Sequence, residues 1–299
     1  AKISYLGEEG FLPVSIHATE ILFPDVVQTS AEKTSQHISA MMMIAPLAGK
    51  DFTIQLSGVS SSMPYIELTA DLMQQAGINV IISEKSIHIN GSYNNKILTA
   101  GGDWSAASYF FETAALADTA DITIKNLNIQ SKQGDKTITG LIKPFGVDTI
   151  VDDDLIVLKK HKKTVPDYFT ESFLHYPDIA LSMAAVCGGL NCKADLLHLH
   201  NLIIKESDRV SAFQREAYKL NIKTDFCGGS KLKILEESNL KPSQSILKTY
   251  NDHRLIMAFA PLALRTNELF LDNISNVSKS FPDYFEQIKS LGFNTEEAL

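Results

Sequence analysis

The sequence has little cysteine and no long apolar run. Its three cysteines, Cys187, Cys192 and Cys227, lack the spacing of a metal-binding pair, and their odd number excludes a complete internal disulfide framework. The apolar stretch at residues 41–49 is too short to span a bilayer, and the N-terminus has no basic segment followed by an apolar one. We therefore expect a cytoplasmic protein without a membrane partner.

Excess positive charge is also absent. The formal net charge is -8 and the isoelectric point is about 5.5, whereas a nucleic-acid surface needs a basic stripe. This charge disfavours nucleic acid as a partner and an enzyme that acts on nucleic-acid ends. The sequence contains no glycine-rich phosphate loop, no cluster of metal ligands and no G-x-S-x-G segment. With those motifs absent, the remaining possibility is that a ligand is bound by separate side chains spread across a cleft.

What the chain does have is an internal repeat. With 299 residues, 44% of them hydrophobic, it exceeds what one core usually serves, so we expect two domains. Helix-like apolar spacing recurs at intervals of about 70 to 75 residues. The predicted first helices span residues 35–48, 105–117, 178–190 and 253–264, the strands after them span 52–58, 121–128, 195–203 and 269–274, and the second helices span 64–77, 136–146, 207–220 and 282–292.

The first three units each end in two alternating runs joined by a polar turn, at residues 79–91, 147–160 and 222–235. These patterns predict hairpins. The unit is thus helix, strand, helix and hairpin, and such a unit needs neighbours to bury its second face.

Polar residues gather where the first helices begin. One interpretation is capping, because Ser, Thr and Asp satisfy the free amides of a first turn. The other is an anion site, since several helix starts facing one cleft would pool their amides and positive dipole ends. The residues are Thr34, Ser35 and Gln36, then Asp103 and Ser105, then Asp178, then His253 and Arg254.

The segment KESDR, residues 205–209, stands where an extended run is expected to become a helix. In the plain interpretation Ser207 caps the helix, Asp208 favours its positive end, and Glu206 pairs with Arg209 or Lys205 on the surface. Arg209 does not fit, because a cation in the first turn opposes the helix dipole. Its position makes sense if an anion lies there.

The same anomaly recurs at Arg254 in YNDHR, and Lys279 lies at a comparable junction before Pro282. In an acidic chain, converging cations indicate a small polyanionic ligand. Asp178 and Glu206 occupy the same class of position and are candidates for proton transfer.

The motifs KESDR, YNDHR, HYPDIALSMA, GGDWSAASYF and SKSFPDYFEQ together resemble, in order and spacing, the 5-enolpyruvylshikimate-3-phosphate synthase (3-phosphoshikimate 1-carboxyvinyltransferase) family over nearly the whole chain. The resemblance implies an α/β (α+β) fold of two domains built from βαβαββ units. It also implies transfer of the enolpyruvyl group of phosphoenolpyruvate to the 5-hydroxyl of shikimate 3-phosphate, with no metal or organic cofactor, by a protein that is monomeric at full length.

The resemblance assigns roles residue by residue. Asp178 corresponds to the proton acceptor and Glu206 to the residue that protonates the methylene carbon. Thr replaces the first Ser of the family's Ser-Ser-Gln group, and Met63 stands where Lys is common after Ser62. The expected shikimate 3-phosphate contacts are Thr34, Ser35, Gln36, Ser62, Tyr65, Asp178, Asn201 and Lys205, and the expected phosphoenolpyruvate contacts are Gln36, Arg209, Arg254 and Lys279.

The family's N-terminal Lys-Ser pair, N-x-G-T segment and R-P-I segment do not occur in this sequence. We therefore expect residues 1–100 to be the remnant of a first domain and residues 101–299 to form the second. An alternative follows, in which the chain binds anions without catalysing the reaction. A second alternative is the related UDP-N-acetylglucosamine enolpyruvyltransferase, although KESDR is not its pattern.

Overall fold

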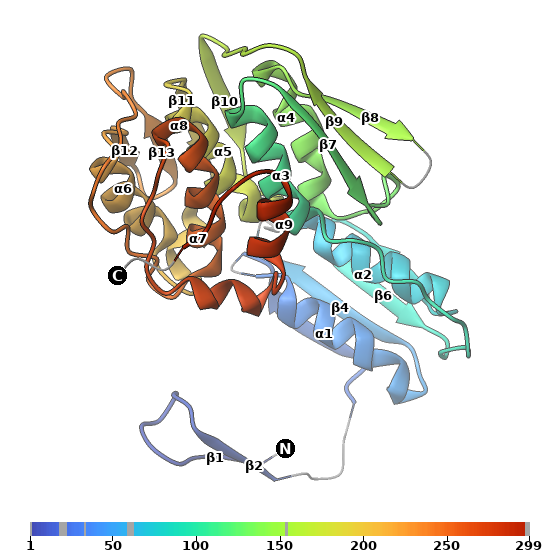
Figure 1. Cartoon of the computed structure of the whole chain (residues 1–299). Helices are drawn as coiled ribbons and strands as arrows, with labels where there is room; N and C mark the ends of the chain where they lie inside the picture. Colours follow the sequence, from blue (N-terminus) through green and yellow to red (C-terminus); the bar gives the residue numbers. More distant parts are fainter. Residues whose placement is uncertain (1, 18–22, 33, 59–62, 153–154, 297–299) are drawn as a thin grey trace. The chain divides into compact units, whose positions relative to one another are not determined.

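The computed structural model of this chain describes residues 2–17, 23–32, 34–58, 63–152 and 155–296. These residues form two compact units (Figure 1). The first unit comprises Ala1–Glu32, Gln36–Ser60 and Thr69–Leu98, and the second comprises Lys33–Ser35, Ser61–Leu68 and Thr99–Leu299.

The first unit contains a four-stranded sheet of order β3-β4-β6-β5, in which β3 runs parallel to β4 and the other pairs are antiparallel. Its strands alternate in burial, so that Ile87 and Ile89 point into the core while His88 between them does not. A separate two-stranded hairpin, β1 with β2, precedes this sheet. The elements are β1 (Lys2–Tyr5), β2 (Val14–His17), β3 (Val26–Ser30), α1 (Gln36–Ile44), η1 (Ala45–Ala48), β4 (Phe52–Ser57), α2 (Met63–Gln75), of which Thr69–Gln75 lies in this unit, β5 (Asn79–Ile82) and β6 (Ser86–Asn90).

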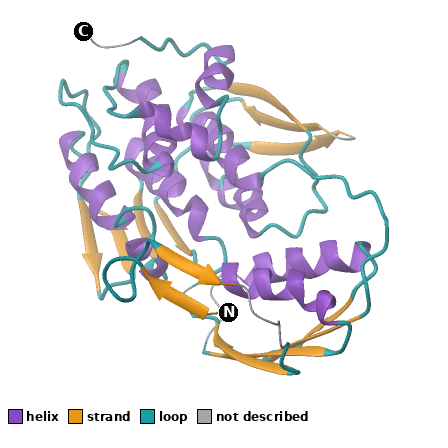
Figure 2. Cartoon of the chain, turned by 90° about the horizontal axis from the view of Figure 1, so that it is seen from below, coloured by secondary structure: helices purple, strands orange, loops and turns teal. Residues whose placement is uncertain are grey.

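The second unit places helices α3, α5 and α7 side by side in its centre, with sheets outside them (Figure 2). Its sheets have the orders β7-β9-β8 and β10-β11-β13-β12. The elements are α3 (Trp104–Leu116), β7 (Ala120–Lys125), η2 (Gly134–Thr137), α4 (Ile138–Leu141), η3 (Lys143–Phe145), β8 (Asp148–Asp152), β9 (Leu155–Lys160), β10 (Tyr168–Ser172), η4 (Pro177–Ile179), α5 (Ala180–Gly189), β11 (Lys193–Leu197), η5 (His200–Ile204), α6 (Arg209–Lys219), β12 (Thr224–Cys227), β13 (Lys231–Ile234), α7 (His253–Phe259), η6 (Ala260–Leu262), α8 (Ala263–Thr266), η7 (Ile274–Lys279) and α9 (Tyr284–Ser290).

Helix α5 is the centre of this core, because every residue from Ala180 to Gly189 is buried. A helix that is apolar on all sides can be stable only when it is covered on all sides. Gly189 allows the close packing, since a Cβ atom there would meet side-chain atoms of Leu116 and Leu262 at 2.6 Å. The absence of a side chain at this position lets α5 approach its neighbours.

The predicted repeat is present. Sheets β3-β4-β6-β5 and β10-β11-β13-β12 share one strand order, and each begins with a strand before the first helix that periodicity did not predict. In both, a backbone bond closes the parallel pair: Ala31 N to Ser57 O at 3.0 Å, and Phe173 N to Leu197 O at 2.9 Å. Gly102 N donates to Asn126 O at 2.7 Å in the same way. By this analogy, the residues just before Gly102 stand where a strand equivalent to β3 and β10 would lie beside β7. Among the described residues, no strand is assigned there.

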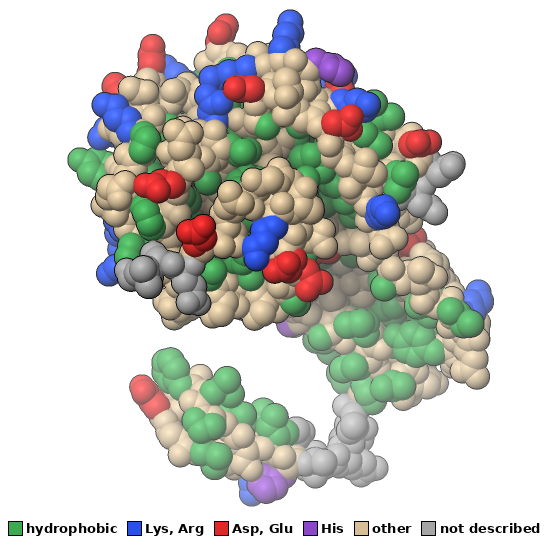
Figure 3. Space-filling model, in the orientation of Figure 1, with side chains coloured by type: hydrophobic (Ala, Val, Ile, Leu, Met, Phe, Trp, Pro, Cys, Tyr) green, Lys and Arg blue, Asp and Glu red, His purple; other side chains and the backbone are tan. Residues whose placement is uncertain are grey.

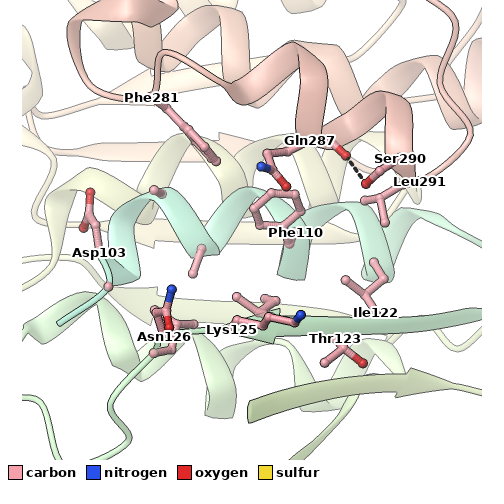
Figure 4. A pocket seen from close by; sticks show the side chains of 15 residues that line it. Asp103, Phe110, Ile122, Thr123, Lys125, Asn126, Phe281, Gln287, Ser290 and Leu291 are labelled. Carbon is pink, nitrogen blue, oxygen red and sulfur yellow. Dashed lines mark hydrogen bonds between the residues drawn. The ribbon is translucent and has the colours of Figure 1, made fainter. Parts of the chain in front are cut away.

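A groove of about 500 Å³ lies along β7 (Figure 4). Phe110 of α3 and Leu291, which directly follows α9, face it, and Phe281 and Ile122 add to its apolar lining, while Asp103 and Lys125 contribute charge. The groove belongs to the second unit.

Three sequence predictions were wrong. Residues 269–274, predicted as a strand, contribute only the isolated bridge Leu247 to Leu271, because Thr249 N donates to the Asp272 carboxylate rather than to a backbone carbonyl. Residues 198–203 leave the predicted strand at His198, which has a φ of 61°, and enter η5. The predicted helix at 136–146 divides into η2, α4 and η3, where Pro144 cannot donate a backbone bond.

Candidate functional site

Arg209 is the centre of a charged cluster at the start of α6. Its side chain is only 2% exposed and contacts three carboxylates. Nε donates to Asp252 Oδ2 at 2.8 Å, Nη1 lies 3.4 Å from Asp178 Oδ1, and Nη2 bonds to Glu206 Oε2. The anion that the sequence predicted beside Arg209 is thus supplied, in this structure, by the chain itself.

Arg254 and Lys279 complete the cluster. Arg254 Nη2 pairs with Asp178 Oδ2 at 2.9 Å, and its Nη1 lies 3.4 Å from the Asp178 carbonyl and 3.5 Å from the Tyr109 hydroxyl. Lys279 Nζ bonds to Glu206 Oε1 at 2.6 Å. Asp178 and Glu206 each contact Arg209 and one further cation.

The cations set the charge of both carboxyl groups. Burial alone would raise the pKa of Asp178, but Arg254, Lys205 and Arg209 outweigh it and lower the pKa below its usual value. Burial acts in the same direction on Glu206, yet the bond from Lys279 and the charge of Arg209 lower the pKa of Glu206 to about 2. Both groups are therefore ionised at neutral pH.

A second set of polar groups lies beside this cluster. Tyr65 at the start of α2 donates its hydroxyl proton to Asp135 Oδ2 at 3.1 Å, and the Ser105 hydroxyl of α3 bonds to the same oxygen. Burial, aided by the charge of Asp178, raises the pKa of Asp135 to about 6 against the opposing effect of Arg254. Sequence reasoning did not select Asp135. Its signal was Gly134, a turn residue directly before a carboxylate.

Three aspartates cap the helices that carry these groups. Asp103 accepts a bond from Ser105 N at 2.9 Å, as predicted, and Asp252 accepts one from Arg254 N at 3.0 Å. At α6 the predicted cap, Ser207, was wrong: Asp208 accepts from Ser211 N at 3.0 Å, while Ser207 Oγ donates to Asp252. Asp178 lies inside η4 and pairs with arginines instead of capping.

The predicted ion pair between Glu206 and Arg209 exists, but it is not a surface pair, because Arg209 is buried. A geometry in which three carboxylates hold one buried guanidinium fixes its orientation.

The other predicted contacts are distributed as follows. Asn201 is buried in η5. Lys205 directly follows η5, and its charge helps to lower the pKa of Asp178. Thr34 and Ser35 belong to the second unit, whereas Gln36 begins α1 in the first. Ser62 lies outside the described residues.

The described residues contain no group of three or more His, Cys, Asp and Glu side chains arranged to hold a metal ion. Within the same residues, no helix combines the length and the apolar composition needed to cross a membrane. On the face drawn in Figure 3, acidic and basic side chains are interspersed rather than gathered into a basic stripe.

Comparison with known proteins identifies the family. The family model described as EPSP synthase (3-phosphoshikimate 1-carboxyvinyltransferase) matches residues 1–288. The 3-phosphoshikimate 1-carboxyvinyltransferase of Bacteroides fragilis is 34% identical over 295 residues, which are 98% of this chain and 72% of that protein. The chain belongs to the EPSP synthase family.

Other EPSP synthases agree. The 3-phosphoshikimate 1-carboxyvinyltransferase of Shewanella woodyi is 32% identical over 296 residues, and the match covers 97% of this chain and 67% of that protein. An EPSP synthase structure from Acinetobacter baumannii aligns with a TM-score of 0.73 at 18% identity, over 97% of this chain and 67% of that one. The enolpyruvyl transferase NikO from Streptomyces tendae gives a TM-score of 0.67 at 14% identity, over 92% and 65%. These two structures show that the chain has the fold of the enolpyruvyl transferases.

Proposed function

We propose that the cluster around Arg209 carries out the EPSP synthase reaction, in which the enolpyruvyl group of phosphoenolpyruvate is transferred to the 5-hydroxyl of shikimate 3-phosphate and phosphate is released. One observation carries this proposal. Two carboxylates, Asp178 and Glu206, share one buried guanidinium and each contacts a second cation. Addition of a hydroxyl to an enol phosphate needs a base, an acid and fixed positive charge, and these groups are candidates for all three roles.

In the proposed reaction Asp178 accepts the proton of the 5-hydroxyl group of shikimate 3-phosphate. The hydroxyl oxygen forms a bond to C2 of phosphoenolpyruvate. Glu206 gives a proton to C3, which becomes a methyl group. Loss of phosphate from C2 and of one proton from the methyl group then restores the carbon–carbon double bond. The proton lost from the methyl group returns to Glu206, and the proton that Asp178 took from the hydroxyl leaves with the released phosphate.

The ionised state of Glu206 makes this role depend on substrate binding. In the protein without substrate, the pKa of Glu206 is about 2, so its carboxyl group has no proton to give at neutral pH. Phosphoenolpyruvate carries a phosphate and a carboxylate, which compete for Arg209, Arg254 and Lys279. As these cations turn to the substrate, the pKa of Glu206 rises and that of Asp178 rises toward the range of a useful base.

The remaining contacts follow the family pattern. We assign shikimate 3-phosphate to Thr34, Ser35, Tyr65, Asn201 and Lys205. Gln36 is assigned to both substrates, and Ser62 to shikimate 3-phosphate. The domain division at residue 100, the monomeric state and the cytoplasmic location stay predictions.

A coupled assay of phosphate release from phosphoenolpyruvate and shikimate 3-phosphate tests the proposal. We expect Asp178→Asn and Glu206→Gln each to lower kcat by about 10²-fold or more, the typical contribution of acid–base catalysis. Glu236→Gln is the matched control, because this carboxylate is exposed and pairs only with Lys193 among the described ion pairs.

Two results would count against the assignment. Turnover that survives both substitutions would remove Asp178 and Glu206 from the chemistry. Calorimetric binding of shikimate 3-phosphate without any turnover by the unsubstituted protein would support the alternative, in which this chain binds anions and does not catalyse.

A further inference from the structure

Asp135 is a buried carboxylate whose two oxygens differ. Oδ2 accepts bonds from the hydroxyls of Tyr65 and Ser105, whereas the buried Oδ1 has no hydrogen-bond partner in the described part of the chain. A native protein keeps few such unsatisfied buried atoms, because a buried polar atom without a partner has lost its hydrogen bonds to water. The arrangement therefore calls for an explanation beyond packing.

The turn that carries Asp135 is held on several sides. Gln133 Oε1 accepts from Trp104 N at 2.9 Å, and its Nε2 donates to Asp103 Oδ1 at 2.6 Å and to Ser105 Oγ at 3.1 Å. These bonds tie the turn to the first residues of α3.

Gly134 permits a close approach to two other segments. A Cβ atom at Gly134 would lie 2.9 Å from the His175 carbonyl oxygen and 3.1 Å from Pro64 Cβ. His175 lies three residues before Asp178, and Pro64 directly precedes Tyr65. The turn thus places one carboxylate between the segment that carries Tyr65 and the segment that carries Asp178.

The charge of Asp135 fixes the direction of these hydrogen bonds. An ionised carboxylate can only accept, so the single hydroxyl proton of Tyr65 is committed to Asp135. Toward any further partner the Tyr65 oxygen can then only accept. The Ser105 hydroxyl is held in the same sense, since it donates to Asp135 and accepts from Gln133.

We propose that Asp135 is a positioning residue that holds the Tyr65 hydroxyl as a hydrogen-bond acceptor for a ring hydroxyl of shikimate 3-phosphate. This inference rests on the proposed function. It adds a residue that acts through Tyr65 and makes the Tyr65 oxygen the acceptor of the hydrogen bond to the substrate. A substrate hydroxyl, which can donate, is therefore preferred over a group that only accepts, such as a keto group.

Protonation would reverse the arrangement. Below a pH of about 6, the pKa of Asp135, the neutral carboxyl group can donate to Tyr65, whose proton is then released toward the ligand. Asp178, Arg254, Ser105 and Tyr65 are the groups that act on this titration. Asp135→Asn is neutral at every pH and cannot make this change.

The experiment is calorimetric titration with shikimate 3-phosphate between pH 5 and pH 8, on the unsubstituted protein, Asp135→Asn, Tyr65→Phe and the double variant. We expect Asp135→Asn to weaken binding about tenfold at pH 8, which corresponds to the loss of one hydrogen bond. The ratio of the dissociation constant of Asp135→Asn to that of the unsubstituted protein should approach one near pH 5. Taking this ratio removes the titration of the ligand's own phosphate. Asp121→Asn, an exposed carboxylate, should leave the ratio at one throughout.

Tyr65→Phe keeps the ring and tests the inference if Asp135→Asn is poorly folded. It should weaken binding at pH 8 to a similar extent, and the double variant should lose no more than either single variant. A ratio that is constant with pH, or additive losses, would reduce Asp135 to a structural residue and overturn the inference while the proposed function stands. If the unsubstituted protein does not bind shikimate 3-phosphate, the proposed function fails and the inference fails with it.

Discussion

At the residue scale, Arg209 is the group on which most others depend. Its removal would leave the fully buried Asp252 carboxylate without its cation. Breaking a buried pair from one side costs about 3–5 kcal/mol, so we expect Arg209→Gln to lower the free energy of unfolding by that amount in urea titrations. Arg265→Gln is the control, since its partner Asp118 is largely exposed and its loss should cost under about 1 kcal/mol. Equal losses for the two variants would contradict the expectation.

Glu112 offers a prediction about pH. It is fully buried in α3, and neither carboxyl oxygen has a hydrogen-bond partner among the described residues. Burial raises the pKa of Glu112 well above its usual value, against a smaller effect of Ser182. Because the folded protein holds this proton more tightly than the unfolded chain, stability falls as pH rises above the ordinary pKa of a glutamate.

We therefore expect Glu112→Gln, which has no proton to lose, to raise the melting temperature at pH 7 and to have little effect near pH 4. Thermal unfolding followed by circular dichroism over this range is the measurement. A gain of the same size at every pH would show that charge is not the cause.

Much of the candidate site was predictable at this scale. A cation in a first helical turn was the signal for Arg209 and Arg254. Lys279, Asp178 and Glu206 were selected because they lie at comparable helix junctions, and the family motifs added their roles. Asp135 and the pairing of Asp252 with Arg209 were not predictable, because each depends on a contact between segments distant in sequence. A single sequence does not show which distant segments come into contact in the folded chain.

At the scale of elements, the start of α3 shows how a cap and a site share residues. Asp103 caps the helix, and Gln133 bonds both to Asp103 and to Ser105. We expect Asp103→Ala to lower the free energy of unfolding by about 1 kcal/mol, and Asp103→Asn to have almost no effect, because Asn caps as well as Asp. Chemical denaturation of both variants measures the difference, and equal behaviour would mean that the cap contributes little.

Helix positions were predicted well where apolar spacing is strong, as in α1, α3 and α5. The predictions failed where side chains take over backbone partners, as Asp272 does at Thr249 N. The strands β3 and β10 were missed because their edge positions leave alternate residues exposed, which weakens the apolar signal.

The open position beside β7 gives a prediction of its own. If residues 99–101 pair with β7 as β3 pairs with β4, the Ala100 amide donates into the sheet and the Thr99 amide points away. Ala100→Pro should then lower the melting temperature more than Thr99→Pro, because only the first removes a bonding N–H. Equal effects of the two prolines would show that no strand forms there.

At the scale of the whole molecule, the two units have unequal cores. The cluster of buried apolar residues in the second unit runs from Trp104 to Ile288, and Trp104 is the only tryptophan of the chain. Tryptophan fluorescence therefore reports on the second unit, while circular dichroism reports on both. We expect the dichroism of the protein to change at lower denaturant than its fluorescence, since the smaller core is less stable. Coincident curves would indicate a single cooperative transition.

Helix α5 has a consequence for synthesis. Its helical partners include α3, which precedes it, and α7, which begins at His253 and is made later. A helix that is apolar on every face therefore leaves the ribosome with one side uncovered and must wait for the later partner. Because domains form as units during translation, the second unit cannot complete its core until α7 emerges. A pause in translation between Gly189 and His253 would lengthen the time during which this surface is open to aggregation or to chaperones.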